Sequence, residues 1–374
     1  GGKGANLAEM SRMGIQVPPG FTITTEVCNY FMEHAELPDS LEKDIKASVQ
    51  KLEEYSGKQF GGEGTPLLLS VRSGGKISMP GMMDSILNIG LNDDNVGKLA
   101  DTFDDERFAL DSYRRLIQMY SNVVLGLEHD RFEAVIANKK RMDNVVSDGD
   151  FNVDQLNWII DAFKNTVERF SKAPFPQDPQ EQLLGAVEAV FASWLNDRAV
   201  TYRKINNIPD AWGTGATVQT MVFGNLNEKS GTGVAFSRNP SNGEKELYGE
   251  YLMNAQGEDV VAGIRTPLPL NKKVATDGNS LEANHPDAFK EIRDISDKLE
   301  THFKDVQDIE FTIENEKIFL LQTRKAKRTA QASVKIAIDM VNEGVISKEE
   351  GLLMVDANNI TNLLHPQFVE SQDK

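Results

Sequence analysis

The 374-residue sequence has one cysteine, Cys28, and five histidines. A single cysteine cannot form an intrachain disulfide, and a structural zinc site needs several thiolate or imidazole ligands at close spacing. This scarcity argues against a disulfide-stabilised secreted domain and against a zinc module, and it predicts an intracellular protein, cytoplasmic or organellar. The chain starts with Gly1 instead of Met and carries no signal-peptide pattern, so we expect that a natural N-terminal segment has been removed.

An excess of positive charge and long apolar runs are also missing. The 40 Lys and Arg residues are outnumbered by 57 Asp and Glu residues, which gives a formal net charge of −17. Because DNA, RNA and anionic membranes attract basic surfaces, the sequence predicts neither a nucleic-acid partner nor a membrane partner. No apolar run approaches the roughly 18 residues that cross a bilayer. The length and the ordinary globular composition indicate two or three compact domains of about 150 residues each.

The patterns that are present predict an α+β protein with a helical insertion. A helix at 37–52 and a short buried strand at 66–72 precede a region in which the apolar residues follow only helical spacing. Glycine turns and β-branched runs then return, and a helical tail ends in polar residues that we expect to start a linker. Later strands are predicted at 217–223, 233–237, 308–314 and 317–323, and a later helix at 288–303. The predicted segments are 1–104 and 206–240 for a first subdomain, 105–205 for the helical insertion, 241–335 for a second subdomain and 336–374 for the tail.

Two cationic side chains lie in glycine-rich surroundings that suit an anion. Lys3 stands in Gly-Gly-Lys-Gly, directly before an apolar helical stretch, where backbone N–H groups and the ammonium can approach one anion together. The Walker spacing is absent, and such a cluster is also typical of a surface turn. Arg72 is predicted at the end of a strand, shortly before the unusual run Ser-Met-Pro-Gly-Met-Met-Asp at 78–84. Its guanidinium suits a phosphate, and a surface ion pair is the alternative.

A further glycine-rich segment, Ser-Gly-Thr-Gly at 230–233, joins two predicted strands. Its backbone N–H groups and hydroxyls can cover phosphates if they form an open loop. A plain β-hairpin turn uses the same residue types, so both interpretations stay open.

The last pair of predicted strands holds the most informative polar residues. Period-two alternation puts Asp308 and Glu310 on one face of the first strand, and Gln322 and Arg324 share one face of the second. Carboxylate and amide oxygens beside an arginine suit Mg²⁺ bound together with substrate phosphates. The alternative is an ordinary cross-strand salt bridge at the surface.

Whether these four side chains meet depends on the hairpin register. With an odd-length loop, Glu310 faces Gln322, the other polar pair also meets, and Phe311 faces Leu321. A two-residue loop would put the polar pairs on opposite faces. The apolar pattern does not choose, because residues 318–321 are apolar throughout.

With these residues in hand, the sequence resembles the nucleotide-binding domain of the pyruvate, phosphate dikinase family, nearly end to end. The resemblance implies an ATP-grasp fold, in which two α/β subdomains enclose ATP, with an all-helical inserted subdomain. The related phosphoenolpyruvate synthases resemble the run at 78–84 less. The blocks that carry the resemblance are Gly-Gly-Lys-Gly-Ala-Asn-Leu-Ala-Glu-Met at 1–10, Val-Pro-Pro-Gly-Phe at 17–21, Ser-Val-Arg-Ser at 70–73, the run at 78–84, Ser-Gly-Thr-Gly-Val-Ala-Phe-Ser-Arg-Asn-Pro at 230–240, Tyr-Gly-Glu-Tyr at 248–251, Asn-Ala-Gln-Gly-Glu-Asp at 254–259 and Leu-Gln-Thr-Arg at 321–324.

The resemblance also implies roles for individual residues. Lys3 and Arg72 would hold the ATP phosphates, and Arg324 would neutralise phosphate charge during transfer, so these three are the expected catalytic side chains. The other implied contacts are Gln219, Met221 and Val222 along the adenine, Gly231, Thr232 and Gly233 over the phosphates, Glu258 near the nucleoside, and Asp308, Glu310 and Gln322 around Mg²⁺.

The family reaction transfers the β,γ-diphosphate of ATP to a histidine and releases AMP. It then passes the two phosphoryl groups to inorganic phosphate and to pyruvate, which gives diphosphate and phosphoenolpyruvate. The family's acceptor histidine lies in a separate domain within Gly-Gly-x-Thr-Ser-His-Ala, a context that none of the five histidines here has. We therefore expect a fragment that binds Mg-ATP, with the phosphohistidine domain and the pyruvate-binding barrel of a homodimeric full-length enzyme as partners. The alternatives are a phosphoenolpyruvate synthase-type relative and a non-catalytic nucleotide-sensing domain.

Overall fold

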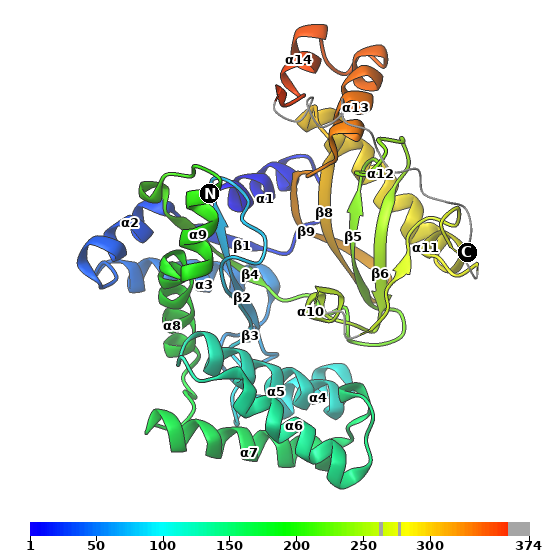
Figure 1. Ribbon diagram of the computed structural model, residues 1–374. Helices are drawn as coiled ribbons and strands as arrows, with labels where there is room; N and C mark the ends of the chain where they lie inside the picture. The colour runs from blue at the N-terminus through cyan, green and yellow to red at the C-terminus, as the bar shows by residue number, and fades with distance from the viewer. Residues whose placement is uncertain (262–264, 276–277, 358–374) are drawn as a thin grey trace. The chain divides into compact units, whose positions relative to one another are not determined.

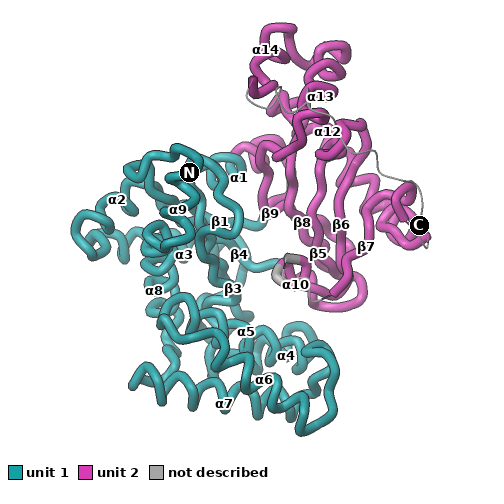
Figure 2. Tube along the Cα trace, in the orientation of Figure 1, with its two compact units in different colours: residues 1–8, 18–222 teal, residues 9–17, 223–374 magenta. Residues whose placement is uncertain are grey.

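The computed structural model describes residues 1–261, 265–275 and 278–357 and, within these ranges, all side chains except those of Glu258 and Val261. The chain divides into two compact units (Figures 1 and 2). Unit 1 comprises residues 1–8 and 18–222, and unit 2 comprises residues 9–17 and everything from Phe223 onward. Both contain helices and an antiparallel sheet, so the predicted α+β class is confirmed.

Unit 1 is built on a four-stranded antiparallel sheet in the order β1, β4, β2, β3. The two interior strands are almost wholly buried, as the short apolar run near 66–72 indicated, although that strand lies slightly later in the chain than predicted. The strands are β1 (Gly20–Ile23), β2 (Leu69–Gly75), β3 (Ser85–Ile89) and β4 (Thr214–Thr220). The helices that precede β2 are α1 (Gly2–Arg12), which begins in unit 1 and ends in unit 2, α2 (Thr25–His34) and α3 (Leu41–Ser56).

Between β3 and β4 the structure is helical, which the uninterrupted helical spacing predicted. Pro179 occupies the first turn of α8, where its missing N–H costs nothing, and Lys172 ends α7 in the left-handed conformation. The helix α8 packs against β2, β3 and β4, whereas α5 packs against β3 and α7. The helices of this region are α4 (Val96–Phe103), α5 (Glu106–Val123), α6 (His129–Asp143), α7 (Val153–Ser171), α8 (Pro179–Ala192) and α9 (Asp197–Ile205).

Unit 2 is built on a five-stranded antiparallel sheet in the order β7, β6, β5, β8, β9. One face of this sheet packs against the long helix α12, through Ser237 after β5, whose hydroxyl donates to Glu300 of that helix at 2.6 Å. The strands are β5 (Gly231–Phe236), β6 (Tyr248–Met253), β7 (Leu268–Pro269), β8 (Gln307–Glu314) and β9 (Lys317–Lys325). The helices are α10 (Gly257–Val261), α11 (Leu281–Asn284), α12 (Pro286–Phe303), α13 (Ala330–Asn342) and α14 (Lys348–Leu353).

The helical tail is packed onto unit 2 as far as the structure describes it. Ala332, Ile336 and Met340 of α13 share a buried apolar cluster with Val306 and Ala326 of the sheet region. The buried guanidinium of Arg238 donates to Glu300 of α12 and to Glu343 at the end of α13, which ties the tail to the sheet. The linker that we expected within 336–374 therefore does not begin before α14 ends, and residues 358–374 lie outside the described part of the chain.

The two strands around residue 230 do not form a hairpin. The first of them, β4, belongs to the sheet of unit 1, and the second, β5, is the middle strand of the sheet of unit 2. The alternative of a plain hairpin turn is therefore wrong, and residues 221–230 connect β4 of unit 1 to β5 of unit 2. No helix in the described ranges combines the length and the apolarity that a membrane crossing requires.

A substitution at Gly233 tests how tightly this middle strand is packed. A Cβ here would lie 2.5 Å from Cζ of the buried Phe311 and 2.6 Å from the carbonyl oxygen of Glu250. We expect Gly233→Ala to lower the free energy of unfolding by about 1–3 kcal/mol, as overpacking does. Gly97→Ala is the control, because nothing lies within 4 Å of its added Cβ. Denaturant titrations of both variants measure this, and equal stabilities would contradict the packing.

Candidate functional site

In unit 1, Arg72 and Lys3 lie over the same face of the sheet. Arg72 of β2 pairs with Thr217 of β4, and Gly74, two residues along the strand, faces the same way. A Cβ added at Gly74 would lie 3.1 Å from the Cβ of Lys3. The missing side chain at Gly74 therefore makes space for Lys3 beside the strand that carries Arg72.

Lys3 lies in the first turn of α1, whereas the sequence placed it before the helix. The N–H groups of a first turn have no partners within the helix, and they carry the positive end of the helix dipole. Lys3 and Arg72 are both partly exposed. An ammonium, a guanidinium and a helix N-terminus thus create a positive region in an acidic chain, which suits a polyanion.

The residues expected along the adenine lie at the end of β4 and just after it. Gln219 is buried, and its amide nitrogen donates to the carbonyl oxygen of Pro18 at 3.0 Å, so its side chain is held by the backbone. Met221 and Val222 follow the strand and are partly exposed. Of the three, these two present side-chain surface to a ligand.

The expectation of a turn over Gly231, Thr232 and Gly233 is wrong. All three belong to β5, which pairs with β6 on one side and β8 on the other, so the sheet occupies the backbone groups that were to cover phosphates. The hydroxyl of Thr232 donates to the carbonyl oxygen of Phe311 at 3.2 Å. The glycines have a packing role instead, because a Cβ at either position would collide with neighbouring atoms.

In unit 2, the structure brings the predicted polar pairs together on one sheet face. Asp308 pairs with Arg324 and Glu310 pairs with Gln322 across β8 and β9. The Arg324 Nε donates to Oδ2 of Asp308 at 2.8 Å, and the Gln322 Nε2 donates to Oε1 of Glu310 at 3.1 Å. These polar pairs are the ones that the alternative with an odd-length loop would give.

The loop itself is the two-residue alternative, and the hairpin combines features of both alternatives because β9 contains a bulge. The loop has two residues, Asn315 and Glu316, both with positive φ, as a tight hairpin requires. Phe311 pairs with Leu320, and Leu321 is the extra residue between Leu320 and Gln322. Without it, the two-residue loop would put the polar residues of β9 on the face opposite to the two carboxylates.

The electrostatics of this face follow from burial. Asp308 is 8% exposed, and this burial raises the pKa of its carboxyl above the ordinary value, with Arg324 opposing the shift and Glu310 adding to it. Gln322 is also buried, whereas Glu310 and Arg324 are partly exposed. A cation beside the two carboxylates would lower the electrostatic free energy of this face.

In the described part of the chain, no group of three or more His, Cys, Asp or Glu side chains is placed to hold a metal by itself. The predicted ligands are two carboxylates and one amide, so a further donor is required. The side chain of Glu258, expected near the nucleoside, lies outside the described residues, although its backbone belongs to α10.

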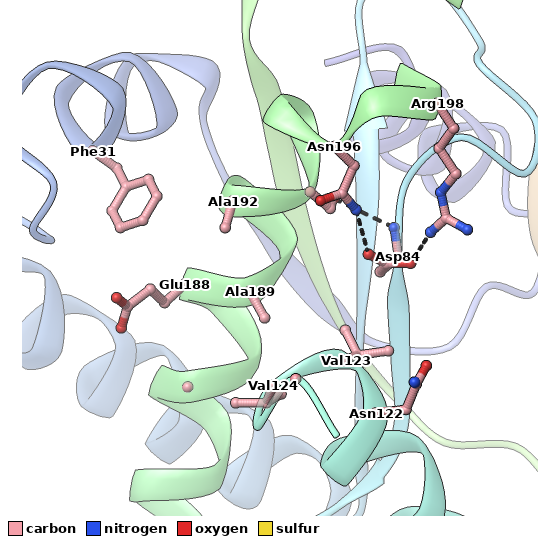
Figure 3. A pocket seen from close by; sticks show the side chains of 13 residues that line it. Phe31, Asp84, Asn122, Val123, Val124, Glu188, Ala189, Ala192, Asn196 and Arg198 are labelled. Carbon is pink, nitrogen blue, oxygen red and sulfur yellow. Dashed lines mark hydrogen bonds and ion pairs between the residues drawn. The ribbon is translucent and has the colours of Figure 1, made fainter. Parts of the chain in front are cut away.

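Unit 1 also contains a cavity of about 570 Å³, which the sequence did not predict (Figure 3). Its walls come from α2, the end of α5, α8 and residues 193–198, and none of the residues expected to contact ATP lines it. At one end, the carboxylate of Asp84 meets the side chains of Asn196 and Arg198. More than a hundred residues separate the two partners, so no local pattern indicates this contact.

Residues 1–58, 34–285 and 270–345 match the family described as "Pyruvate phosphate dikinase, AMP/ATP-binding domain". The chain belongs to this family. The pyruvate, phosphate dikinase of Rhizobium meliloti (strain 1021) is 51% identical over 98% of this chain and 41% of its own length. That of Clostridium symbiosum is 51% identical over 98% of this chain and 41% of its own length. The chloroplastic enzyme of Mesembryanthemum crystallinum is 47% identical over 98% of this chain and 38% of its own length.

Membership of the pyruvate phosphate dikinase AMP/ATP-binding domain family confirms the resemblance drawn from the sequence blocks. The chain spans about two fifths of the length of these relatives. The matched part is the N-terminal domain of the dikinases.

The raised pKa of Asp308 leads to a test by pH. Since burial favours the protonated carboxyl in the folded state, ionised Asp308 lowers stability as the pH rises through the raised pKa. The side chain of Asn resembles the protonated form. We expect Asp308→Asn to be as stable as wild type or more stable at pH 7, and the difference to disappear as the pH falls below the raised pKa. Denaturant titrations from pH 4 to pH 7 measure this; a less stable variant at pH 7 would mean that attraction to Arg324 outweighs burial.

Proposed function

We propose that this chain is the ATP-binding domain of a pyruvate, phosphate dikinase. It would bind Mg-ATP and donate the β,γ-diphosphate to a histidine of a phosphohistidine domain outside this sequence. The full reaction would be ATP + phosphate + pyruvate giving AMP + diphosphate + phosphoenolpyruvate. The observation that carries the proposal is the paired arrangement of Asp308 with Arg324 and Glu310 with Gln322 on one sheet face, in a member of the AMP/ATP-binding family.

Transfer of a phosphoryl group depends on positioning and on neutralising negative charge, and cationic side chains provide both. We assign the ATP phosphates to Lys3 and Arg72, whose side chains leave the backbone over the same face of the unit 1 sheet. Arg324, held by Asp308, would neutralise charge that develops during transfer. The two sheets, one in each unit, support an assignment to the ATP-grasp class.

The donor set suits Mg²⁺, which prefers oxygen ligands and is commonly held by one or two carboxylates together with substrate phosphates. Asp308, Glu310 and Gln322 would hold it, and ATP would complete the coordination. When bound, the ion would neutralise phosphate charge. The two carboxylates, in turn, would be relieved of their mutual repulsion.

The other partners follow from the same proposal. A phosphohistidine domain and a pyruvate-binding barrel would belong to the full-length enzyme, which we propose to be a homodimer in the cytoplasm or an organelle. Their part of the reaction would take place outside the residues of this chain.

Calorimetry of nucleotide binding tests the site assignment. We expect Arg72→Ala to weaken ATP binding roughly 10- to 100-fold with or without magnesium, because it removes a charged hydrogen-bond donor. Glu310→Gln should weaken binding only when magnesium is present. Arg141→Ala and Glu36→Gln, at exposed positions in the helical region and after α2, are the matched controls. Unchanged affinity in both site variants would refute the assignment.

Mixing experiments test the transfer step. With an isolated phosphohistidine domain of a dikinase, the wild-type chain should release AMP from Mg-ATP, and Arg324→Ala should release it at least tenfold more slowly, since it removes transition-state charge stabilisation. Tight ATP binding with no AMP from the wild type would favour the nucleotide-sensing alternative. Liquid chromatography of the nucleotides gives the readout.

A further inference from the structure

The segment between β2 and β3 is held in place by side chains from much later in the chain. Residues 76–84 contain the Ser-Met-Pro-Gly-Met-Met-Asp run, to which the proposed function assigns no role. Met79 is buried in a cluster with Trp194, Ala199 and Ile208, and Met82 and Met83 pack against the same cluster. Apolar contacts of this kind keep the segment packed against the protein, but they do not fix the path of its backbone, because methionine adapts to many packing arrangements.

The path of the backbone is fixed by polar contacts at the end of the segment (Figure 3). The guanidinium of Arg198 forms an ion pair with Asp84, and its Nε donates to the carbonyl oxygen of Met82 at 3.1 Å. Asn196 Nδ2 donates to Oδ2 of Asp84 at 3.0 Å. The backbone N–H of Asp84 donates to the hydroxyl of Ser193 at 3.4 Å. Residues 82 and 84 are thus held by polar contacts from residues 193–198, and Met83 between them packs against the apolar cluster.

These contacts adjoin the residue that we assign to the phosphates. Asp84 directly precedes Ser85, and Ser85 is the residue of β3 that pairs with Arg72. On the other strand, a Cβ added at Gly75 would lie 3.7 Å from the Trp194 ring and 3.9 Å from the end of Met83. Trp194 therefore lies beside Gly75 at the end of β2, and residues 193–198 hold Asp84, the residue that directly precedes β3.

We propose that Arg198, with Asn196 and Ser193, is a positioning residue for Arg72: by holding Asp84 it fixes the start of β3, and thereby the direction from which the Arg72 guanidinium approaches phosphate. This inference rests on the proposed function of Arg72. It concerns the binding geometry and not the stability of the fold. The Arg198 side chain is 51% exposed, and an ion pair that exposed contributes only about 0–1 kcal/mol to stability.

The cavity beside Asp84 explains why the contacts from Arg198 and Asn196 are needed to hold this residue. Asp84, Asn196 and Arg198 line one end of it, and the rest of the lining mixes apolar groups such as Phe31 and Val123 with polar ones such as Glu188. Because about 570 Å³ lies next to Asp84, packing alone does not confine this carboxylate. Without Arg198, residues 82–84 can move into this space and carry the start of β3 with them.

The experiment measures Mg-ATP affinity by calorimetry and amide hydrogen exchange over 76–89 in the same chain. We expect Arg198→Ala to weaken affinity about 5- to 20-fold and to speed exchange over 76–84, which reflects the loss of two hydrogen-bonded contacts. The denaturation midpoint should not change. Arg198→Lys keeps the charge beside Asp84 and should restore most of the affinity. Arg131→Ala removes a partly exposed arginine that pairs with Glu128 in the helical region, and it serves as the matched control.

A double variant separates this inference from the proposed function. If Arg198 acts through Arg72, then Arg198→Ala should have no further effect on affinity in an Arg72→Ala background. An equal loss in both backgrounds, or no loss in wild type, would overturn the positioning role. If Arg72→Ala itself leaves affinity unchanged, the assignment of Arg72 to phosphate fails instead. If Arg198→Ala lowers the denaturation midpoint, the Arg198→Lys variant is the deciding test. Weak Mg-ATP binding by Arg198→Lys, with its denaturation midpoint and its exchange rate over 76–84 unchanged from wild type, would also overturn the proposal.

Discussion

A single extra residue in β9, Leu321, is the constraint on which the polar face of unit 2 depends. The tight turn at Asn315 and Glu316 sets one register for the apolar half of the hairpin, and the bulge shifts the register before the polar half begins. Side chains alternate with period two, so a shift by one residue moves an entire set to the opposite face. The bulge thus gives the hairpin both a short turn and an acid–amide–arginine face, which a regular ladder with this turn could not combine.

This arrangement concentrates two carboxylates and needs a rigid support behind it. On the opposite sheet face, the ring of Phe311 occupies the space that the missing side chain of Gly233 leaves, and Phe311 itself is fully buried. Since Phe311 follows Glu310 directly in β8, its packing helps to keep Asp308 and Glu310 opposite their partners in β9. The glycine-rich segment therefore supports this face from the opposite side of the sheet, through packing in the core. Burial and the neighbouring Glu310 together raise the pKa of Asp308, although Arg324 opposes the shift.

Much of this structure could be predicted from sequence where the signal is local. Helical spacing indicated the helices between β3 and β4, and period-two alternation put Asp308 and Glu310 on one face. The bulge could not be predicted, because the run before Gln322 is apolar throughout and fits either register. The position of Gly231 and Gly233 inside a strand could not be predicted, because close packing between strands and an open phosphate loop favour glycine for the same steric reason.

The contact between Asp84 and Arg198 lies at the other extreme, because it joins residues from distant parts of the chain and follows from the tertiary fold alone. This contact also assigns the helical region between β3 and β4 a role in positioning Arg72. That region is continuous with the segment 193–198, which lies beside Gly75 of the strand that carries Arg72 and holds Asp84, the residue before β3. With an overall charge of −17, the chain can attract a polyanion only where a few cations converge. Their orientation then matters more than their number, and the helical region supplies part of that orientation.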